Sequence, residues 1–175
     1  MNWTIDPAHT SATFAVRHMM ITNVRGEFQK VSGKVSYNPD NLAGTHIDVS
    51  LEASSINTRE PQRDTHLKSA DFLDAEKFPS VNFVSRSAKA AGPGKLKISG
   101  DLTIRGTTRE VTLDVEGPTP PHKDPWGNMR VGATATTTIQ RSDFGLVWNT
   151  ALEAGGFLVG EDVTITLDVS LIQDK

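Results

Sequence analysis

The sequence predicts an all-β domain of antiparallel strands, and three observations support this. Its dominant hydrophobic period is two residues, as expected for strands that bury one face. Gly, Pro, Asn and Asp cluster in short turns between the periodic runs. There are about eight to ten such runs, a number at which antiparallel sheets close into a barrel or divide into a sandwich. Periodicity alone leaves both architectures open.

The last periodic run is the clearest strand. Apolar residues occupy every second position from Val163 to Leu171, and Thr, Asp or Ser stands between them. A shift of one residue would expose this whole apolar set to water, so the register is strongly specified. The same alternation predicts earlier strands within residues 12–18, 47–51, 80–86, 96–104 and 111–115.

One segment departs from the strand pattern. Residues from Glu60 to Phe72 lack β-branched runs and are rich in good helix formers. Pro61 fits the first turn of a helix, where its missing N–H is not needed, and Pro79 precedes the next strand. We therefore expect a short helix here, inserted between strands and covering an end or a seam of the sheet.

Length and composition indicate one domain over residues 1–175 with a single core. Hydrophobic residues make up 37% of the chain and charged residues 22%, which fits a folded globular domain. The net charge is -3 and no basic stripe is present, so we expect no nucleic-acid partner. The chain contains no cysteine, which excludes disulfides and thiolate metal sites.

Targeting signals are absent from the sequence as it stands. The N-terminus has neither a cationic start nor an apolar run of signal-peptide length, so we expect a cytoplasmic protein. No stretch reaches the roughly 20 apolar residues that span a bilayer. We therefore expect no stable membrane insertion, and contact with lipid only as extracted molecules or at a surface.

Catalytic and metal-binding motifs are also absent. Nothing matches a Walker loop, a dinucleotide-binding fingerprint, a nucleophile elbow or a zinc-protease helix. His9, His18 and His66 lie far apart and have no metal-ligand spacing, so we expect no metal. Acidic pairs such as Asp71 with Asp74 are typical of solvated turns. We expect no cofactor and no enzymatic activity.

The predicted helix carries a possible anion-binding face. Arg59, Arg63 and His66 are spaced three and four residues apart and would share one side of a helix. Such a face could meet an anionic head group, although exposed helices commonly carry charges of this kind.

Several strings along the chain resemble the YceI family of lipocalin-like, polyisoprenoid-binding bacterial proteins. The resemblance begins with Trp3-Thr4-Ile5-Asp6-Pro7-Ala8-His9-Thr10 and extends over essentially the whole chain. The further strings that carry it are His18-Met19, Gly26-Glu27-Phe28, Ser55-Ile56-Asn57-Thr58, Arg63-Asp64, His66 to Leu73, Phe78-Pro79, Gly100 to Gly106 and Arg141-Ser142-Asp143-Phe144-Gly145.

The resemblance implies an extended antiparallel, lipocalin-like β-barrel of about eight strands with a short helical insert. Its interior would be an apolar tunnel that binds a long-chain isoprenoid lipid, with a quinone or a polyprenyl phosphate as head group, for carriage, storage or sequestration. Many relatives are periplasmic, whereas the start of this sequence does not resemble a signal peptide, so we expect this chain to belong with the cytoplasmic relatives.

We expect the tunnel lining to come from strands, from the helical insert and from one end of the barrel. The strand residues are Phe14, Val16, Phe28, Phe83, Ile104 and Ile139. Leu67 and Phe72 come from the insert, and Trp148, Leu152 and Phe157 lie near an end. Met19 is a further inward-facing candidate. His18, His66 and Arg63 would contact a head group or form hydrogen bonds that fix the helix.

Two other functions remain open at the sequence level. An isoprenoid-modifying or hydrolytic enzyme would use the histidines with Asp64 or Asp71, and would place a strongly perturbed titratable group in the cavity. A filled-core interaction module, acting as a homodimer, would have no continuous internal void.

Overall fold

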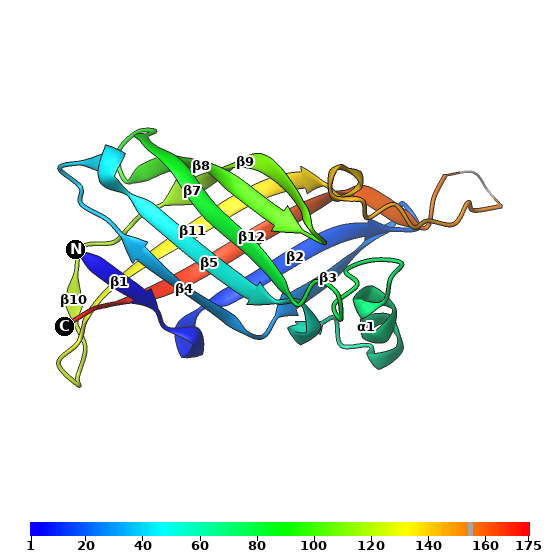
Figure 1. Ribbon diagram of the computed structural model, residues 1–175, viewed down its shortest axis with the longest axis horizontal. Coiled ribbons are helices and arrows are strands. Elements are labelled where there is room, and N and C mark those ends of the chain that lie inside the picture. The colour runs from blue at the N-terminus through cyan, green and yellow to red at the C-terminus, as the bar shows by residue number, and fades with distance from the viewer. Residues whose placement is uncertain (154–155) are drawn as a thin grey trace.

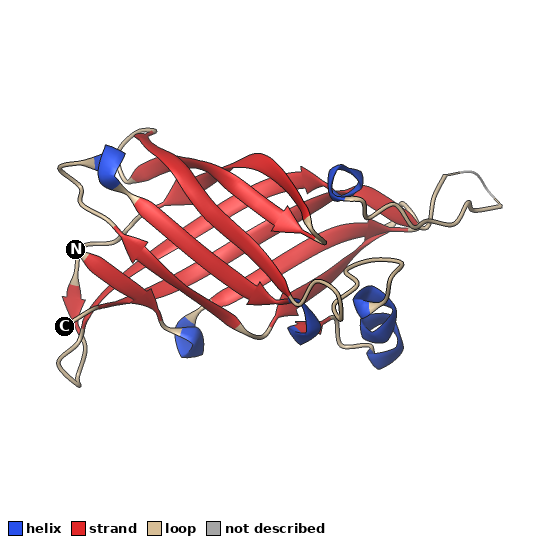
Figure 2. Ribbon diagram, viewed as in Figure 1, coloured by secondary structure: helices blue, strands red, loops and turns tan. Residues whose placement is uncertain are grey.

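The computed structural model describes residues 1–153 and 156–175, and antiparallel strands dominate it (Figure 1). The strands are β1 Asn2–Ile5, β2 Ser11–His18, β3 Thr22–Phe28, β4 Val31–Ser36, β5 His46–Glu52, β6 Ile56–Asn57, β7 Ser80–Ala90, β8 Lys95–Ile104, β9 Thr107–Glu116, β10 His122–Lys123, β11 Met129–Gln140 and β12 Val159–Gln173. The helices are α1 Pro61–Lys68 and the short 3₁₀ turns η1 Pro7–His9, η2 Leu42–Gly44, η3 Ala53–Ser55 and η4 Arg141–Phe144 (Figure 2).

Eight of the strands close into a ring. The order β12-β11-β9-β8-β7-β5-β4-β1 returns to β12, and every pairing in it is antiparallel. The closing pair is β11 with β12, which runs from Arg130 opposite Ile172 to Gln140 opposite Asp162. This confirms the antiparallel barrel and resolves the choice that periodicity left open.

Strand β12 pairs with β11 along one edge and with both β1 and β2 along the other, which closes the barrel. Its C-terminal part pairs with β1, and residues 159–168 pair with β2. Strand β2 continues into β3 as a hairpin, and β3 pairs in turn with the short β6. The segment from β6 to β7, which contains α1, leaves the edge of the β2–β3 hairpin and returns beside the end of β5, where Ser80 pairs with Glu52 and the Ala53 N–H donates to the Pro79 carbonyl.

Helix α1 is the expected helical insert, and it is shorter than the sequence indicated. It begins at Pro61, where the Glu60 side chain accepts a hydrogen bond from the Gln62 N–H. It ends at Lys68 rather than Phe72 because the backbone N–H and the hydroxyl of Ser69 both bind the His66 carbonyl. Within residues 1–153 and 156–175, no helix has the length and apolar character needed to cross a bilayer.

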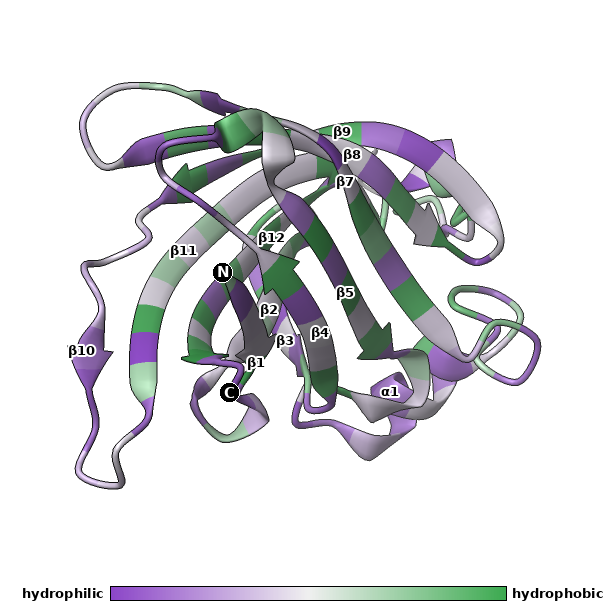
Figure 3. Ribbon diagram, turned by 60° about the vertical axis from the view of Figure 1, so that its left-hand side comes forward, coloured by the Kyte–Doolittle hydropathy of each residue, from purple (hydrophilic) through white to green (hydrophobic). Residues whose placement is uncertain are grey.

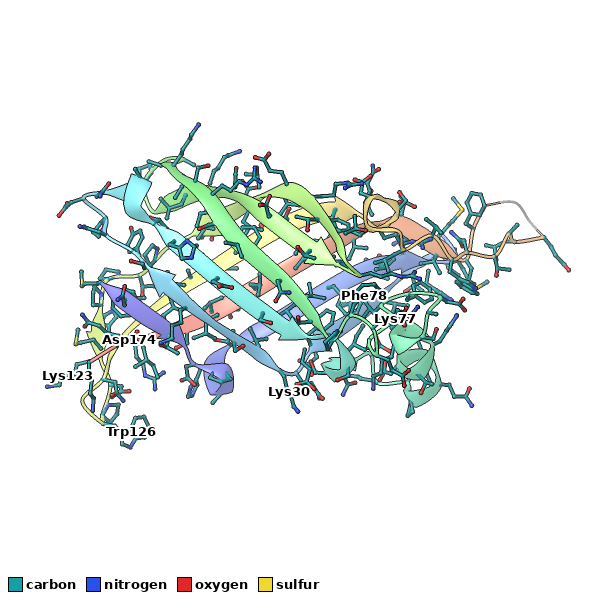
Figure 4. All side chains as sticks on the ribbon, in the orientation of Figure 1. Lys30, Lys77, Phe78, Lys123, Trp126 and Asp174 are labelled. Carbon is teal, nitrogen blue, oxygen red and sulfur yellow. The ribbon has the colours of Figure 1, made fainter. Side chains whose placement is uncertain are left out.

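The two ends of the barrel are formed by different segments of the chain, and we call them the terminal end and the helix end (Figure 1). The terminal end holds both chain termini, β1, the connection 37–45 and the loop 117–128. The helix end holds α1, the β2–β3 turn and the connection from η4 to β12. Along the strands, inward residues are mostly apolar and outward residues mostly polar, and this alternation gives the banded strands in Figure 3. Lys30 and Lys123, for example, project outward (Figure 4).

An ion-pair cluster holds the terminal end together. Arg130 on β11 donates to Asp6 at 2.6 Å and to Asp124 at 2.7 Å, joining residues that lie more than a hundred positions apart. His9 lies 2.7 Å from the same Asp6 oxygen. The Arg130 hydrogen bond is the main reason that the pKa of Asp6 falls to about 2, and it also holds the pKa of Asp124 well below its usual range.

Candidate ligand cavity

The barrel encloses a cavity of about 250 Å³ that reaches from one end to the other. Trp3 and Tyr37 line it at the terminal end, and Leu67 and Phe72 line it at the helix end. Its exposed wall is apolar. A filled core would leave no such continuous void, so the filled-core interpretation does not describe this barrel.

The alternating pattern of the strands explains the apolar wall. On β8, Leu96, Ile98, Leu102 and Ile104 are buried and line the cavity, and the residues between them are polar or Gly100. The void persists because β11 contributes small residues at two inward positions, Ala133 and Ala135, where neighbouring strands contribute Leu, Ile or Val. Side-chain volume on one wall thus sets the width of the cavity.

Two inward phenylalanines fit because glycines lie beside them. Phe14 stands opposite Gly26 on β3, and an added Cβ at Gly26 would lie 2.5 Å from the Phe14 ring. A Cβ at Gly100 would lie 2.7 Å from the Phe83 ring and 2.4 Å from the Val84 carbonyl oxygen. These glycines therefore leave room for the rings against the sheet.

An aromatic cluster closes the helix end. The His66 ring on α1 meets the rings of Trp148 and Phe72 edge-on, at centroid distances of 4.7 and 5.0 Å. Phe72 and Trp148 also contact each other at 5.5 Å. The His66 Nε2 lies 2.9 Å from Asp71, outside the cavity. Histidine and aromatic packing thus hold α1 against the barrel.

Arg141 organises the same end from inside. Its guanidinium is buried and donates to the carbonyls of Leu146 at 2.6 Å and Trp148 at 2.9 Å, and also to those of Gly160 and Val159. Burial lowers the pKa of Arg141. Because these carbonyls belong to both sides of the connection from η4 to β12, Arg141 fixes the path of that connection. The string Arg141-Ser142-Asp143-Phe144-Gly145 in the family resemblance was the sequence signal for it.

The residues that line the terminal end of the cavity include some that sequence reasoning did not assign. Trp3, Tyr37 and Thr45 line the cavity there. The Trp3 Nε1 and the Thr45 Oγ1 are buried and have no hydrogen-bond partner among the described residues. Alternation within Trp3-Thr4-Ile5 was the available signal that Trp3 faces inward.

Seven of the predicted ligand-contacting residues lie on the cavity wall: Phe14, Phe28, Leu67, Phe72, Phe83, Ile104 and Ile139. They come from β2, β3, β7, β8 and β11 and from the α1 segment, so the fold brings them together around one space. Contact of each one with a ligand stays a prediction.

The other predicted residues lie off the wall. The end of β2 extends beyond the cavity and contains Val16 and His18. Met19 follows in the β2–β3 turn, where it is exposed. Leu152 and Phe157 belong to the connection before β12, where Phe157 is 60% exposed. Their apolar character suggested lining, but that connection extends past the barrel instead of folding into it (Figure 1).

The remaining three residues support the lining without belonging to it. Arg63 donates to the Thr58 hydroxyl at 2.8 Å and to the Thr58 carbonyl at 2.7 Å, which ties α1 to the end of β6. His66 and Trp148 form the outer part of the aromatic cluster. Of the two roles predicted for Arg63 and His66, the structure therefore shows contacts that fix the helix.

The acid–base arrangement of the enzyme alternative does not lie in the cavity. Asp64 accepts from the backbone and the hydroxyl of Thr58, and Asp71 faces His66 at the surface. Of the described residues on the wall, Arg141 is the charged one, and its hydrogen bonds go to carbonyls. Nor do three or more potential metal-ligating His, Asp or Glu side chains gather anywhere in the described part of the chain.

Curated proteins with similar sequences match most of the chain. A UPF0312 protein of Staphylococcus aureus (strain MSSA476) is 36% identical over 162 residues, which cover 93% of this chain and 92% of the relative. A UPF0312 protein of Vibrio cholerae (O1 classical strain O395) is 36% identical over 139 residues, covering 79% and 73% of the two chains.

Solved structures share the fold. The YCEI protein of Campylobacter jejuni is 28% identical, with a TM-score of 0.76 over 91% of this chain and 90% of the other. Burkholderia cenocepacia BcnA has a TM-score of 0.80 at 22% identity, covering 95% and 98%. A polyisoprenoid binding domain from Saccharophagus degradans has a TM-score of 0.71 at 12% identity, covering 98% of each chain. The YceI-like domain matches residues 3–171, and the chain therefore belongs to the YceI-like family.

Proposed function

We propose that this protein binds a long-chain isoprenoid lipid inside its barrel and carries or stores it. The observation that carries the proposal is the apolar cavity that reaches from Trp3 to Phe72. Water that leaves an apolar cavity gives up few hydrogen bonds to the protein, and burial of an apolar chain in its place lowers the free energy. The name of the Saccharophagus degradans domain, a polyisoprenoid binding domain, points to the same ligand class.

The energy of binding can come from the chain alone. Burial of each CH₂-sized group contributes about 0.8 kcal/mol, so each five-carbon unit contributes roughly 3 to 4 kcal/mol before the cost of ordering the chain. This free energy of burial requires no charged group on the protein. Binding of this kind is what a carrier or a reservoir requires.

The cavity volume sets how much chain fits without rearrangement. An apolar cavity of about 150 Å³ takes up benzene, so the 250 Å³ here corresponds to roughly ten carbon atoms, or two prenyl units. A longer isoprenoid requires inward rings such as Phe14 and Phe83 to rotate, or part of the chain to leave through an end. Affinity should therefore rise most steeply over the first two prenyl units.

The test is retention of lipid by a protein whose cavity is narrowed. Ala135→Phe places a ring in the cavity, whereas Thr136→Phe places the same ring on the outer face of the same strand. The proteins are purified without detergent, extracted with organic solvent, and the extract is analysed by mass spectrometry. Reloading with farnesol, a three-unit isoprenoid, then measures binding directly.

We expect the wild-type protein and Thr136→Phe to retain isoprenoid-mass species and to bind farnesol, and Ala135→Phe to lose both. Circular dichroism confirms that both variants are folded. Equal farnesol binding by a folded Ala135→Phe variant would refute the proposal, as would a wild-type protein that neither carries nor takes up isoprenoid.

A further inference from the structure

Several large apolar side chains are exposed together at the helix end of the barrel. Met20, Ile21 and Phe157 have 62%, 72% and 60% of their surface exposed, and Met19 has 42%. Single exposed apolar residues are common in soluble proteins, whereas a contiguous patch of them marks a surface that contacts a partner. We call these four residues the apolar tip.

The apolar tip is one patch because two segments of the chain meet in it. The Met19 N–H of the β2–β3 turn donates to the Leu158 carbonyl of the connection before β12 at 2.8 Å. The Met20 sulfur lies against Gly156, where an added Cβ would collide with it. Figure 1 shows the turn and the connection side by side, at the opposite end of the barrel from the two chain termini. The apolar tip therefore forms an end surface of the molecule.

The backbone of the β2–β3 turn indicates that its methionines have a role other than stability. Met19 and Met20 have φ of 51° and 62°, a region in which Asn and Gly are far more favourable. These two side chains thus strain the turn and also remain largely in contact with water. Strained residues of this kind concentrate at functional sites, which favours a binding role for the exposed side chains.

Two arginines lie behind the apolar tip on the outer face of the same hairpin. Arg25 stands opposite Ala15, and Arg17 is two residues from Ala15 on β2, so both point outward. Both are exposed, and neither forms an ion pair among the described residues. No acidic residue occurs within residues 17–25. The first acidic residue further along β3, Glu27, lies about 7 Å beyond Arg25.

The neighbouring segment adds little negative charge to this arrangement. Glu153 belongs to the connection before β12, and Glu161 lies near the start of β12. The Glu161 carboxylate accepts a hydrogen bond from the Ser142 N–H at 2.8 Å, and the charge of the nearby Arg141 lowers its pKa further. The β2–β3 hairpin therefore presents an apolar end with positive charge behind it.

A lipid bilayer fits this arrangement better than a second protein does. A stable protein interface involves about 20 to 30 residues on each partner, far more than the four of the apolar tip. A bilayer interface takes up a few apolar side chains to a depth of about 5 to 10 Å, and anionic lipids attract cationic residues near its surface. At about 3.3 Å for each residue, Arg17 lies roughly 10 Å from Met20, which places it at the level of the lipid head groups.

We propose that the apolar tip docks the helix end of the barrel on the surface of an anionic lipid bilayer, where the protein exchanges its isoprenoid. This inference rests on the proposed function for its purpose, because an isoprenoid carrier has to meet the membrane that holds the lipid. The cavity reaches Leu67 and Phe72 at this same end, so docking brings that end of the cavity to the bilayer. Docking itself requires no bound isoprenoid.

Flotation of delipidated protein with lipid vesicles tests docking in the absence of isoprenoid. One set of vesicles is phosphatidylcholine alone, and the other is an equal mixture of phosphatidylcholine and phosphatidylglycerol. Met19→Asn with Met20→Gly removes two side chains of the apolar tip and relieves the strain in the turn. Trp126→Asn is the matched control, because it removes an apolar side chain that is 78% exposed at the terminal end.

A second pair of variants tests the contribution of charge. Arg17→Gln with Arg25→Gln removes two positive charges behind the apolar tip. Lys123→Gln with Lys175→Gln removes the same charge from exposed residues at the terminal end, so it controls for the net charge of the protein. Each protein is also tested for uptake of farnesol from solution, which requires the cavity and not the tip.

We expect the wild-type protein and both terminal-end controls to bind the anionic vesicles, and to bind phosphatidylcholine vesicles much less. The methionine variant should bind anionic vesicles about three- to ten-fold more weakly, because only part of each side chain is buried at a lipid interface. Each arginine should contribute about five-fold, and less as the salt concentration rises. Farnesol uptake should be unchanged throughout. A melting temperature at or above that of the wild-type protein would show that the methionine variant is folded.

Three results would overturn the inference. The first is a wild-type protein that does not bind anionic vesicles. The second is equal weakening by Trp126→Asn and by the methionine variant. The third is a wild-type dimer, seen by sedimentation velocity, that the methionine variant abolishes, which would assign the apolar tip to a second copy of the chain. Farnesol uptake without vesicle binding would refute docking alone, whereas vesicle binding by a protein that takes up no isoprenoid would refute the proposed function and the exchange role with it.

Discussion

The two ends of the barrel are built by different physical means. The terminal end is joined by Arg130 and its two carboxylates, and its left-handed turn positions are glycines, such as Gly92 and Gly117. The helix end is closed by ring packing and by the Arg141 contacts with carbonyls. All the described non-glycine residues with positive φ belong to this end: Met19, Met20, Arg59, Asp74 and Arg105.

Surface composition follows the same division. Most of the large apolar side chains that are strongly exposed in the described structure lie near the helix end: Met19, Met20, Ile21, Val147 and Phe157. The terminal end has Trp126, which is 78% exposed, and Met1 (Figure 4). The terminal end is therefore stabilised by charge pairs and by glycine turns. The helix end contains strained backbone positions and is stabilised mainly by buried packing.

The largest effect should come from Arg141 at the helix end. Arg141→Met removes the Arg141 donor from the carbonyls of Leu146, Trp148 and Gly160, whereas the Val159 carbonyl keeps its hydrogen bond from Asn149, and we expect the free energy of unfolding to fall by about 3 to 4 kcal/mol. Urea titration measures this. Arg141→Lys keeps the charge but cannot reach all four carbonyls, so it should be intermediate. A loss below about 1 kcal/mol in Arg141→Met would mean that Arg141 does not hold this end.

The charge pairs of the terminal end predict sensitivity to acid. Asp6→Asn should lower stability at pH 7 by about 2 kcal/mol because Arg130 loses a charged hydrogen-bond partner. In the wild-type protein the pKa of Asp6 is lowered from 3.8 to about 2, so its contribution is complete above about pH 5 and is lost progressively as the pH falls through 2. Urea titrations at several pH values should therefore show the two proteins converging in acid. A stability difference independent of pH would contradict this account.

The strained turn at the helix end should be improvable. Met19 and Met20 have φ of 51° and 62°, and the Ile21 N–H binds the His18 carbonyl, which is the geometry of a type I′ hairpin turn. Asn and Gly tolerate these positions far better, so Met19→Asn with Met20→Gly should raise stability by about 1 kcal/mol. Thermal unfolding provides the measurement. A lower melting temperature would show that the methionines stabilise the turn through contacts that outweigh the strain.

The smallest effect should be at the cavity wall of the terminal end. Thr45→Val removes a buried hydroxyl that has no partner, and we expect the empty protein to gain about 0.5 to 1 kcal/mol. Thr137→Val serves as the comparison. Destabilisation by Thr45→Val in delipidated protein would mean that its hydroxyl is already satisfied, for example by ordered water.

The strands and much of the cavity wall could be predicted from the sequence, because the alternation of apolar and polar residues reports directly on burial. The run from Val163 to Leu171 became β12, and Phe14, Phe83 and Ile104 lie where alternation placed them. Closure into a barrel required the pairing of β11 with β12, which no local pattern encodes. The family resemblance supplied that step.

What sequence reasoning missed depended on three-dimensional context. Leu152 and Phe157 are apolar but belong to a connection that leaves the barrel, and hydropathy cannot distinguish the two cases. The Arg130 pairs join distant residues, and the missing partners of Trp3 and Thr45 are visible only when all neighbours are known. An unsatisfied polar group can be identified only in the packed structure, because every neighbour must be known before a hydrogen-bond partner can be called absent.

The central claim, a lipid chain held lengthwise in the barrel, can be tested most directly by locating both ends of a bound probe. Crystals of the protein saturated with 11-bromoundecan-2-one would show the bromine by anomalous scattering. We predict a bromine peak inside the barrel, with probe density that follows the cavity between Trp3 at one end and Phe72 at the other. A bromine found only on the outer surface, or a barrel interior without probe density at saturation, would contradict the account.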